Sequence, residues 1–495
     1  MKNILYIGFI ILILASCTKL DEELYSEIPE DRFPENADQA AALTVPPYAP
    51  LTQLLDNGGW WFAQEVTSDE MTAPTRHTDW DDGGKWRVLH QHTWNNETEA
   101  INNMWSHYYD GAILCNEALF LLPPPTSEEA LSSIAKMKVL RAFYYYLLID
   151  NYGDVPYITS FADAPSEPFK TKREDIFDSL VQSIEANVKF LPSSTSKYDV
   201  GKAMAFSLLA KLYLNAEVYT GTPQWAKAEA ACDSVIEMGY SLESNPLAPF
   251  ITANDGSTEN IFTIAFDEND PDDRGEFNLH MRTLHYNSNL TFDMTVGPWN
   301  GFAAMEEYFY TYEDIDKRRE GFLVGQQYTF DGTEIVDDGA DGAKLIFDPH
   351  IPALQMDATY TSVEIRMSGV RVAKFEIAKG ARQRLSNDFP LFRYGDILLM
   401  KAEAQIRQGG NGDEYVNMIR NRAGLNNWSG VDLPRLLEER GREMFWEAKR
   451  RQDLIRFGEF NKSWWEKSAS SADRNIFPIP QWAIDSNPNL ALDPL

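Results

Sequence analysis

Basic residues are in short supply in this chain, which has 44 Lys and Arg against 75 Asp and Glu. The formal net charge of −31 has the wrong sign for a phosphate backbone, which argues against nucleic acid as a partner. After the N-terminal segment, no apolar run reaches the roughly 20 residues that a membrane-spanning helix needs. What remains is a globular composition, 44% hydrophobic and 24% charged, with enough chain for a large core.

Catalytic signatures are also missing from the sequence. It contains no G-x-S-x-G, no H-E-x-x-H and no phosphate-binding G-x-x-x-x-G-K pattern. Carboxylates are so numerous that some pair must lie close together by chance. Sequence alone cannot identify a glycosidase pair, whose mark is a spatial separation. We therefore predict that the protein is not an enzyme.

The N-terminus has the features of a secretion signal. In "MKNILYIGFIILILASC", one Lys precedes an apolar run from Ile4 to Leu14, and small residues follow. The run is too short and wrongly flanked for a spanning helix, so we predict a signal peptide over residues 1–16. Its end resembles a lipobox, which implies that Cys17 carries a lipid anchor; an ordinary signal peptide with a chance Cys is the alternative. The following "TKLDEE" resembles the surface-export signal of some Gram-negative outer-membrane lipoproteins.

Two further cysteines complete the chain's set of 3. If Cys17 carries the lipid, Cys115 and Cys232 can form at most one disulfide. Both lie in helical patterns among apolar neighbours, in "AILCNEALFLL" and "AEAACDSVI". We expect free, buried thiols, with the single disulfide as the alternative.

Long segments with apolar residues at the 3.6-residue period predict a mostly α-helical protein. Ser127 can cap one of these helices, acidic Glu128 and Glu129 suit its first turn, and Gly153 ends it. Two helix pairs are predicted, one across "TGTPQ" and one across "GGNG", and the first has the spacing of a tetratricopeptide-like hairpin. The predicted helices cover residues 101–122, 127–152, 174–191, 202–219, 225–238, 394–408, 413–423 and 434–457.

Between the helical blocks the sequence changes character. Residues 241–392 are rich in Pro, Gly, Asp and aromatics, with short alternating runs such as "NIFTIAF" and "VRVAKFEI" that predict strands. Because helix pairs occur on both sides of this region, we expect one intertwined domain over 17–495. Its helical scaffold lies mainly in 101–240 and 390–460, and its loop-rich, ligand-facing parts are 55–100 and 241–392.

Histidine and aspartate are concentrated in "TRHTDWDDGGKWRVLHQHTW", residues 75–94. The spacing of His77, His90 and His92 matches no standard zinc pattern. "DWDDGG" resembles the start of a calcium loop, but twelve residues counted from Asp79 end on His90 instead of Glu. We expect these histidines to pack and hydrogen-bond within a long loop. We predict no metal and no cofactor, and leave open a structural Ca²⁺ held by scattered acids elsewhere.

Tryptophan is abundant and uneven: six of the 13 Trp fall between residues 60 and 105. A Trp face suits the flat C–H face of a sugar, and short polar groups suit its hydroxyls. Trp80 and Trp86 flank the turn-forming "DDGG", and Trp299 lies in "GPWNGF". These three are our candidate ligand contacts. We expect Trp94, Trp105, Trp225 and Trp446 to be structural.

Four motifs in the C-terminal third resemble, in order, the signature of the SusD/RagB family of outer-membrane lipoproteins. "KMKVLRAFYYYLLIDNYGDVPYI" (Lys136–Ile158) resembles the family's N-terminal helix and turn, and "DWDDGGKW" recurs in some members. The four motifs are "FPLFRYGDILLMKAEAQIR" (Phe389–Arg407), "VNMIRNRAGL" (Val416–Leu425), "LLEERGREMFWEAKRRQDLIRFG" (Leu436–Gly458) and "FPIPQWAIDSNPNL" (Phe477–Leu490).

The resemblance implies four tetratricopeptide-like helix pairs as scaffold and a loop-rich ligand face. It also implies an outward-facing outer-membrane lipoprotein that captures oligosaccharides and delivers them to a TonB-dependent, SusC-like transporter. Peptide capture, as in RagB-like members, is the alternative, and a protein that binds only the transporter is a third hypothesis. Family members hold sugar on Trp from an early and a mid-chain loop, which here match Trp80 or Trp86 and Trp299. Proximity in sequence adds Arg76, Asp79, Tyr286 and Asn300.

Overall fold

The structure, a computed structural model, describes residue 34 and residues 36–270 and 275–494, so the predicted signal peptide and Cys17 lie outside the described residues. The predicted mostly helical class is confirmed. The longer α-helices are α5 (Glu99–Leu121), α6 (Glu128–Tyr152), α7 (Arg173–Asn187), α8 (Lys202–Leu214), α10 (Trp225–Ile236), α15 (Tyr394–Arg407), α16 (Asp413–Arg422), α17 (Leu433–Met444) and α18 (Arg450–Phe457). The shorter ones are α2 (Ala37–Ala42), α3 (Trp60–Val66), α4 (Lys85–His90), α9 (Ala216–Thr220), α11 (Leu279–Thr283), α12 (Asn289–Phe292), α13 (Glu306–Phe309), α14 (Ser362–Met367) and α19 (Gln481–Ser486).

Helix α6 shows how local sequence sets these boundaries. The Ser127 side chain accepts a hydrogen bond from the Ala130 N–H at its start, and Glu128 and Glu129 lie in the first turn, where acidic groups suit the helix dipole. The helix ends at Gly153, whose φ of 73° is a conformation that glycine adopts without strain. The cap, the acidic first turn and the glycine stop are as predicted.

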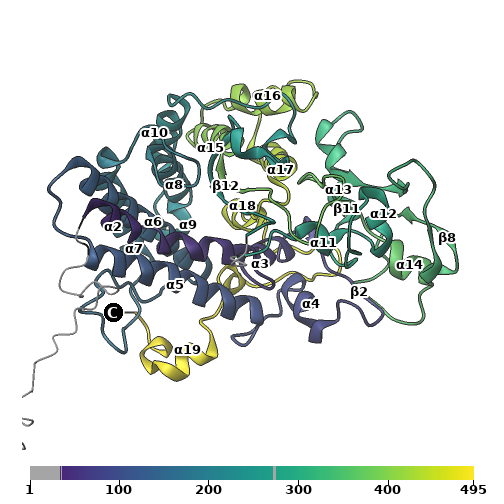
Figure 1. Cartoon of the computed structure of the whole chain (residues 1–495), viewed down its shortest axis with the longest axis horizontal. Coiled ribbons are helices and arrows are strands. Elements are labelled where there is room, and N and C mark those ends of the chain that lie inside the picture. The colour runs from purple at the N-terminus through teal and green to yellow at the C-terminus, as the bar shows by residue number, and fades with distance from the viewer. Residues whose placement is uncertain (1–33, 35, 271–274, 495) are drawn as a thin grey trace, which may run out of the picture.

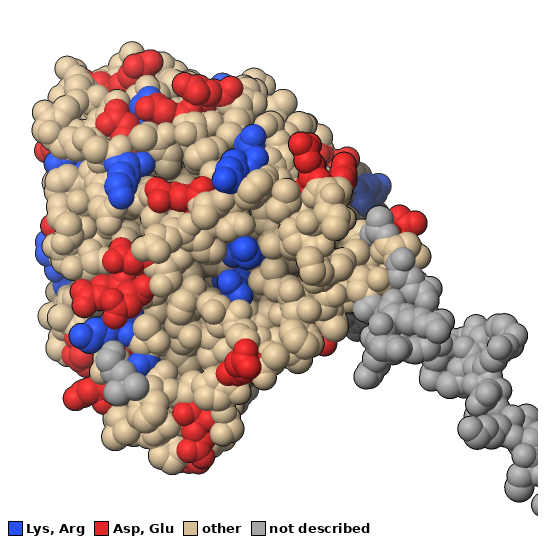
Figure 2. Space-filling model, turned by 90° about the vertical axis from the view of Figure 1, so that its left-hand side faces the viewer, with Lys and Arg blue, Asp and Glu red and all other residues tan. Residues whose placement is uncertain are grey.

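The long helices pack against one another into a scaffold. Helix α5 packs on α6, α6 on α7, α8 on α10, and α10 on α15, which also contacts α16 and α17. Figure 1 shows these helices at the left and centre of the molecule, with the green, loop-rich segment at the right. The outer face of the helical end carries acidic and basic groups scattered between larger uncharged areas (Figure 2).

Strands are short and pair two by two. The longest pair joins β3 (Asn260–Ile264) to β12 (Phe389–Arg393) in antiparallel register. The predicted strand over 260–266 is thus present, whereas the run at 370–377 contributes only β11 (Arg371–Val372). The other strands are β1 (Met71–Thr72), β2 (Thr75–Arg76), β4 (Ala303–Ala304), β5 (Phe322–Leu323), β6 (Gly325–Gln326), β7 (Val336–Asp337), β8 (Ala343–Lys344), β9 (Ile346–Phe347) and β10 (Gln355–Met356).

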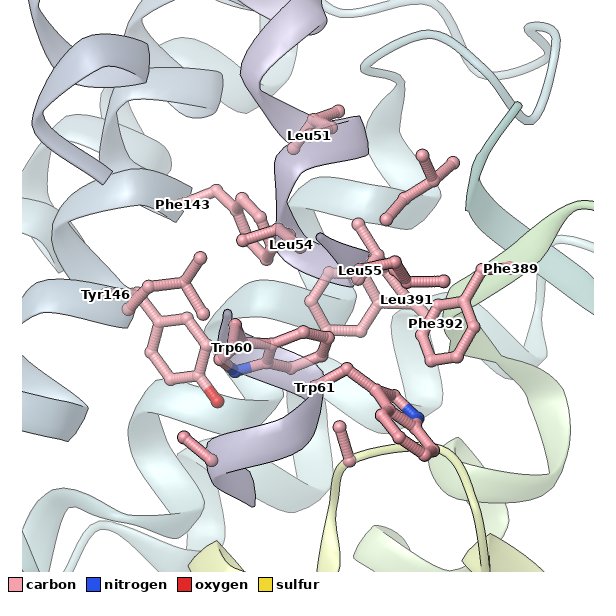
Figure 3. Packing of buried hydrophobic residues seen from close by; sticks show 14 of the residues in the cluster. Leu51, Leu54, Leu55, Trp60, Trp61, Phe143, Tyr146, Phe389, Leu391 and Phe392 are labelled. Atoms are coloured by element: carbon pink, nitrogen blue, oxygen red, sulfur yellow. The ribbon is translucent and has the colours of Figure 1, made fainter. Parts of the chain in front are cut away.

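One apolar core joins distant parts of the chain. Its members run from Leu51 to Leu490, and Figure 3 shows Trp60 and Trp61 of α3 between side chains of α6 and β12. Trp94 and Trp105 are buried as predicted, while Trp225 is only half-buried against the core. Both Cys115 and Cys232 are buried and free, which confirms the prediction for them.

The long helix predicted over 434–457 is wrong, because the chain breaks between α17 and α18. Trp446 and Ala448 have φ values of 67° and 58°, in the left-handed region that these residue types rarely adopt. Side chains from elsewhere hold the exposed main-chain groups. Lys374 Nζ donates to the carbonyls of Glu443 and Phe445, Trp61 Nε1 donates to that of Trp446, and Glu65 accepts from the Ala448 N–H.

A buried ionic network surrounds this break. The Arg393 guanidinium, 1% exposed, donates to Glu259 at 2.7 Å, to Glu443 at 2.6 Å, and to both oxygens of Glu447 at 2.6 and 2.8 Å. Arg422 donates to Glu259 and to Glu443 from the other side. Burial by itself raises the pKa of Glu443, but Arg422 and Arg393 outweigh it and hold this pKa below its usual range.

We expect Glu443→Gln to lower the free energy of unfolding by about 3–5 kcal/mol, because it leaves three buried guanidinium groups, those of Arg318, Arg393 and Arg422, without their shared carboxylate. Urea unfolding measures the loss. Glu459→Gln is a matched control, since Glu459 pairs with Lys462 at the surface, and it should leave the unfolding midpoint unchanged. An equal effect of the two substitutions would show that the network does not stabilise the fold.

Candidate functional site

Two loops that are far apart in sequence meet at the loop-rich end of the molecule. Strand β2 pairs in parallel with β10, and the chain then turns tightly so that the N–H and carbonyl groups of Arg76 and Asp79 bond to each other. Trp80 follows, and its Nε1 donates to the main-chain carbonyl of Trp299 at 2.7 Å. A Cβ on Gly301 would lie 2.2 Å from the Trp80 ring, so the second loop needs glycine there. The structure therefore brings together the two segments that the sequence singled out.

Unusual backbone conformations are concentrated in these loops. His77, Trp80 and Asp82 in the first loop and Asp293 and Asn300 in the second have φ values between 40° and 62°. Each such residue costs of the order of 1 kcal/mol or more and persists only where the surroundings enforce it. Strain of this kind marks the junction of the two loops as a functional site candidate.

The two tryptophans of the first loop have different positions. Trp86, on α4, is 1% exposed; it packs on Phe62 and Phe302 and donates to Asp82. Its prediction as a ligand contact therefore does not fit the structure, because the apolar core covers its faces. Trp80 is half-buried, with its ring against Phe302.

Two polar candidates are buried as well, and their predicted contact with ligand does not fit. Arg76, 2% exposed, donates to the carbonyls of Ile365 and Ser368. Asn300, 0% exposed, donates to the carbonyl of Arg366 and accepts from Arg371. A polar group must find partners when it is buried, and these side chains find them in the strand and helix behind the loops.

Four of the seven candidates reach the surface: Asp79, Trp80, Tyr286 and Trp299. The Tyr286 hydroxyl donates a hydrogen bond to the Asp79 carboxylate. Partial burial, with help from this bond, raises the pKa of Tyr286 to about 12, so the phenol stays neutral at physiological pH. Trp299 is half-buried with the Arg282 guanidinium 5.1 Å from its ring centroid. The exposed face thus combines three aromatic rings with a carboxylate.

His90 and His92 serve the packing of the loop, in agreement with the prediction, whereas His77 is exposed. His90 Nε2 lies 2.8 Å from the carbonyl of Trp465, and His92 lies between the carbonyl of Thr67 and the hydroxyl of Ser470. The carboxylates of the acidic turn also have partners within the protein: Asp81 pairs with Arg87, and Asp82 accepts a hydrogen bond from Trp86. In the described part of the chain no group of three or more His, Cys, Asp or Glu is placed to hold a metal ion.

Comparisons with known proteins agree with this architecture. Residues 258–494 match the model described as "SusD family", and residues 35–214 match the one described as "Starch-binding associating with outer membrane". Between them the two matches cover most of the chain. The chain belongs to the SusD family.

Relatives of the SusD family match over much of their length. The starch-binding protein SusD of Bacteroides thetaiotaomicron is 26% identical over 74% of this chain and 73% of its own. The SusD-like protein P2 of Formosa agariphila is 24% identical over 98% of each chain. Among solved structures, a laminarin-binding SusD-like protein superposes with a TM-score of 0.72 at 21% identity, covering 91% of this chain and 98% of that one.

Membership of the SusD family settles two broader points. SusD-like proteins are non-catalytic, which confirms the prediction that this chain is not an enzyme. The SusD family is associated with the outer membrane. No helix among the described residues is long and apolar enough to cross a bilayer.

Sequence reasoning missed the residues behind Tyr286. His285, Asp337 and Arg366 form a polar cluster there, with His285 Nε2 3.2 Å from Asp337 and the Arg366 guanidinium 4.6 Å from the Tyr286 ring centroid. Arg366 is 80 positions from Tyr286, and no local pattern links them. The sequence held one hint. If Tyr286 turns one face of its ring to a ligand, another residue must pack against the opposite face.

We expect the folded protein to lose stability between pH 7 and pH 5, in part through His90. Burial lowers its pKa to about 4, so the unfolded chain binds a proton near pH 6.5 while the folded chain does not. Stability from this group is complete above pH 6.5 and falls as the pH drops towards 4. The free energy of unfolding should fall between pH 7 and pH 5 in both proteins. The fall should be smaller in His90→Gln than in the wild type, by up to about 2 kcal/mol. An equal fall in the two proteins would mean that His90 becomes charged in the folded state as readily as in the unfolded chain.

Proposed function

We propose that this protein captures neutral oligosaccharides at the cell surface through the face formed by Asp79, Trp80, Tyr286 and Trp299. The observation that carries the proposal is the junction of Trp80 with Trp299, which presents aromatic rings from two strained loops beside an exposed carboxylate. Aromatic rings cover the C–H faces of a sugar, and Asp79 is an acceptor for its hydroxyls.

The geometry suits reversible capture. We call the face formed by Asp79, Trp80, Tyr286 and Trp299 the platform. It is open and its rings are half-buried, so a bound sugar keeps contact with water on its outer side. Stacking and a few solvated hydrogen bonds must offset the loss of translational freedom, and the surplus is modest. Modest affinity favours release to a downstream partner. The strained loops are already fixed in the free protein, which limits the entropy lost on binding.

Charge selects among glycans. Three of the basic groups near the platform are paired: Lys85 with Glu99 at 3.1 Å, Arg87 with Asp81 at 2.7 Å, and Lys379 with Asp293 at 3.7 Å. The buried Arg76 and Arg282 donate to neutral groups instead. Asp79 and Asp82 have no ion-pair partner within the described ranges. The net charge of −31 on the whole chain, to which these two carboxylates contribute, disfavours polyanionic sugars.

The names of related proteins support glycan capture. One relative is a starch-binding protein, and one structural neighbour is a surface glycan-binding protein A of Bacteroides thetaiotaomicron in complex with laminarihexaose. That neighbour superposes with a TM-score of 0.71 at 20% identity and covers 92% of this chain. Because the fold is shared and the ligand face is built from loops, the sugar itself must be found by experiment.

The proposal includes attachment and transfer. A lipid on Cys17 would tether the protein to the outer membrane, facing the cell exterior, and a TonB-dependent, SusC-like transporter would accept the oligosaccharide. The predicted signal peptide and the acidic residues that follow Cys17 support this placement. No cofactor takes part in the proposed function.

Trp80→Ala, Trp299→Ala and Tyr286→Ala should each weaken binding at least tenfold, about 1.4 kcal/mol, because each removes a ring of the platform. The full chain in detergent is run by affinity electrophoresis in a panel of neutral polysaccharides, and thermal unfolding shows that each variant is folded. Trp482→Ala is the matched control, since Trp482 is 48% exposed on α19. Retardation that survives all three substitutions would place the ligand elsewhere. Peptide binding without polysaccharide binding would favour the peptide-capturing alternative.

Polyuronates such as alginate and polygalacturonate should cause at least tenfold weaker retardation than neutral glycans at physiological salt. The reason is repulsion from the net charge of −31, to which Asp79 and Asp82 contribute at the platform. Asp79→Asn should reduce the difference in retardation between polyuronates and neutral glycans, while Asp485→Asn on α19 should leave this difference unchanged. Stronger binding of a polyuronate than of any neutral glycan would contradict the assignment of a neutral ligand.

A further inference from the structure

Arg366 lies against the ring of Tyr286, one of the half-buried aromatic residues of the platform. It belongs to α14, and its guanidinium carbon is 4.6 Å from the centroid of the Tyr286 ring, within the range of a cation–π contact. Its side chain is 25% exposed, so the group reaches the surface beside the ring. Tyr286 is thus held at two points, by this guanidinium on its ring and by Asp79 on its hydroxyl.

The orientation of Arg366 is fixed by a buried carboxylate. Its Nε and Nη2 donate to the two oxygens of Asp337 at 2.5 and 2.8 Å, a bidentate pair that sets the guanidinium plane. Asp337 is 1% exposed and is itself held by the Gly339 N–H at 3.1 Å. His285 Nδ1 accepts from the Asn287 N–H, and its Nε2 lies 3.2 Å from the Asp337 carboxylate. The cluster has one defined arrangement.

The pairing leaves one side of the guanidinium unused. Nε and Nη2 point to Asp337, while Nη1 has no hydrogen-bond partner in the described part of the chain and is not among the buried unpaired atoms. A planar guanidinium with two donors engaged presents its remaining N–H groups on the opposite edge. Because the guanidinium lies over one face of the Tyr286 ring, a sugar that extends past the edge of this ring would meet Nη1.

We propose that Arg366 is a further saccharide-binding residue, which donates from Nη1 to a sugar hydroxyl while its guanidinium plane backs the Tyr286 ring. The inference rests on the proposed function and adds a donor to a face that otherwise offers an acceptor in Asp79. Because its charge is balanced by Asp337, Arg366 recognises a neutral hydroxyl without drawing anionic glycans to the site.

Gly339 offers a way to move the guanidinium without removing it. A Cβ on Gly339 would lie 2.4 Å from the Arg366 guanidinium carbon, and the glycine has no left-handed φ. Gly339→Ala therefore strains little of the backbone and displaces the flexible end of Arg366. This variant therefore changes the position of the guanidinium and keeps its charge.

The test compares Arg366→Gln, Arg366→Lys and Gly339→Ala by isothermal titration calorimetry of the full chain in detergent, with laminarihexaose and maltoheptaose as probes. We expect each variant to lose at least fivefold in affinity for the probe that the wild type binds. Lysine should not rescue binding, because it has neither the fork nor the plane of arginine. Thermal midpoints of the lysine and Gly339 variants should stay near that of the wild type.

Arg319→Gln is the matched control. Arg319 is 24% exposed, pairs with Asp314 and lies 4.7 Å from the Phe309 ring centroid, a similar arrangement outside the two platform loops. It should bind like the wild type. Affinities within twofold of the wild type for all three test variants, while Tyr286→Ala loses binding, would overturn the role of Arg366 and leave the proposed function standing. A wild type that binds neither these probes nor any neutral polysaccharide would overturn both.

Discussion

The buried guanidinium of Arg393 is the interaction on which much of the structure depends. It comes from the end of β12 and meets three carboxylates from two separate segments: Glu259 before β3, and Glu443 and Glu447 at the end of α17 and in the break that follows. An ion so buried is tolerable only if every partner is in place, so one residue fixes the mutual position of β3, α17 and the break before α18. The start of the C-terminal scaffold is thereby tied to the loop-rich half.

The same constraint accounts for the broken helix. An uninterrupted helix over 434–457 would use the carbonyls of Glu443 and Phe445 internally, yet these carbonyls accept from Lys374 and Arg393 instead. Each buried cation needs several acceptors, and carbonyls released by a break supply them. To release these carbonyls the chain adopts left-handed backbone conformations at Trp446 and Ala448, which are unfavourable for these residue types.

Sequence reasoning succeeded where structure is set by neighbours along the chain. The cap, first turn and stop of α6 are local features, and most of the helices were found with ends displaced by a few residues. It failed where distant groups compete for the backbone, as between α17 and α18. At the site it found both loops but could not separate Trp80 from Trp86, because both flank the same turn. Which one faces the core depends on Phe62 and Phe302, which lie elsewhere in the chain. Arg366 could not be found, since only the fold brings it to Tyr286.

The hydrogen bond that joins the two loops ends on a main-chain oxygen. Trp80 donates to the carbonyl of residue 299, not to its side chain, so any amino acid at that position preserves the junction. The glycine that admits the Trp80 ring stands two positions later and is likewise independent of the side chain at 299. The loop frame and the recognition surface are therefore separable: the platform can exchange its outer ring without rebuilding the frame. A scaffold with this property can diversify among ligands by single substitutions, each step leaving a folded protein.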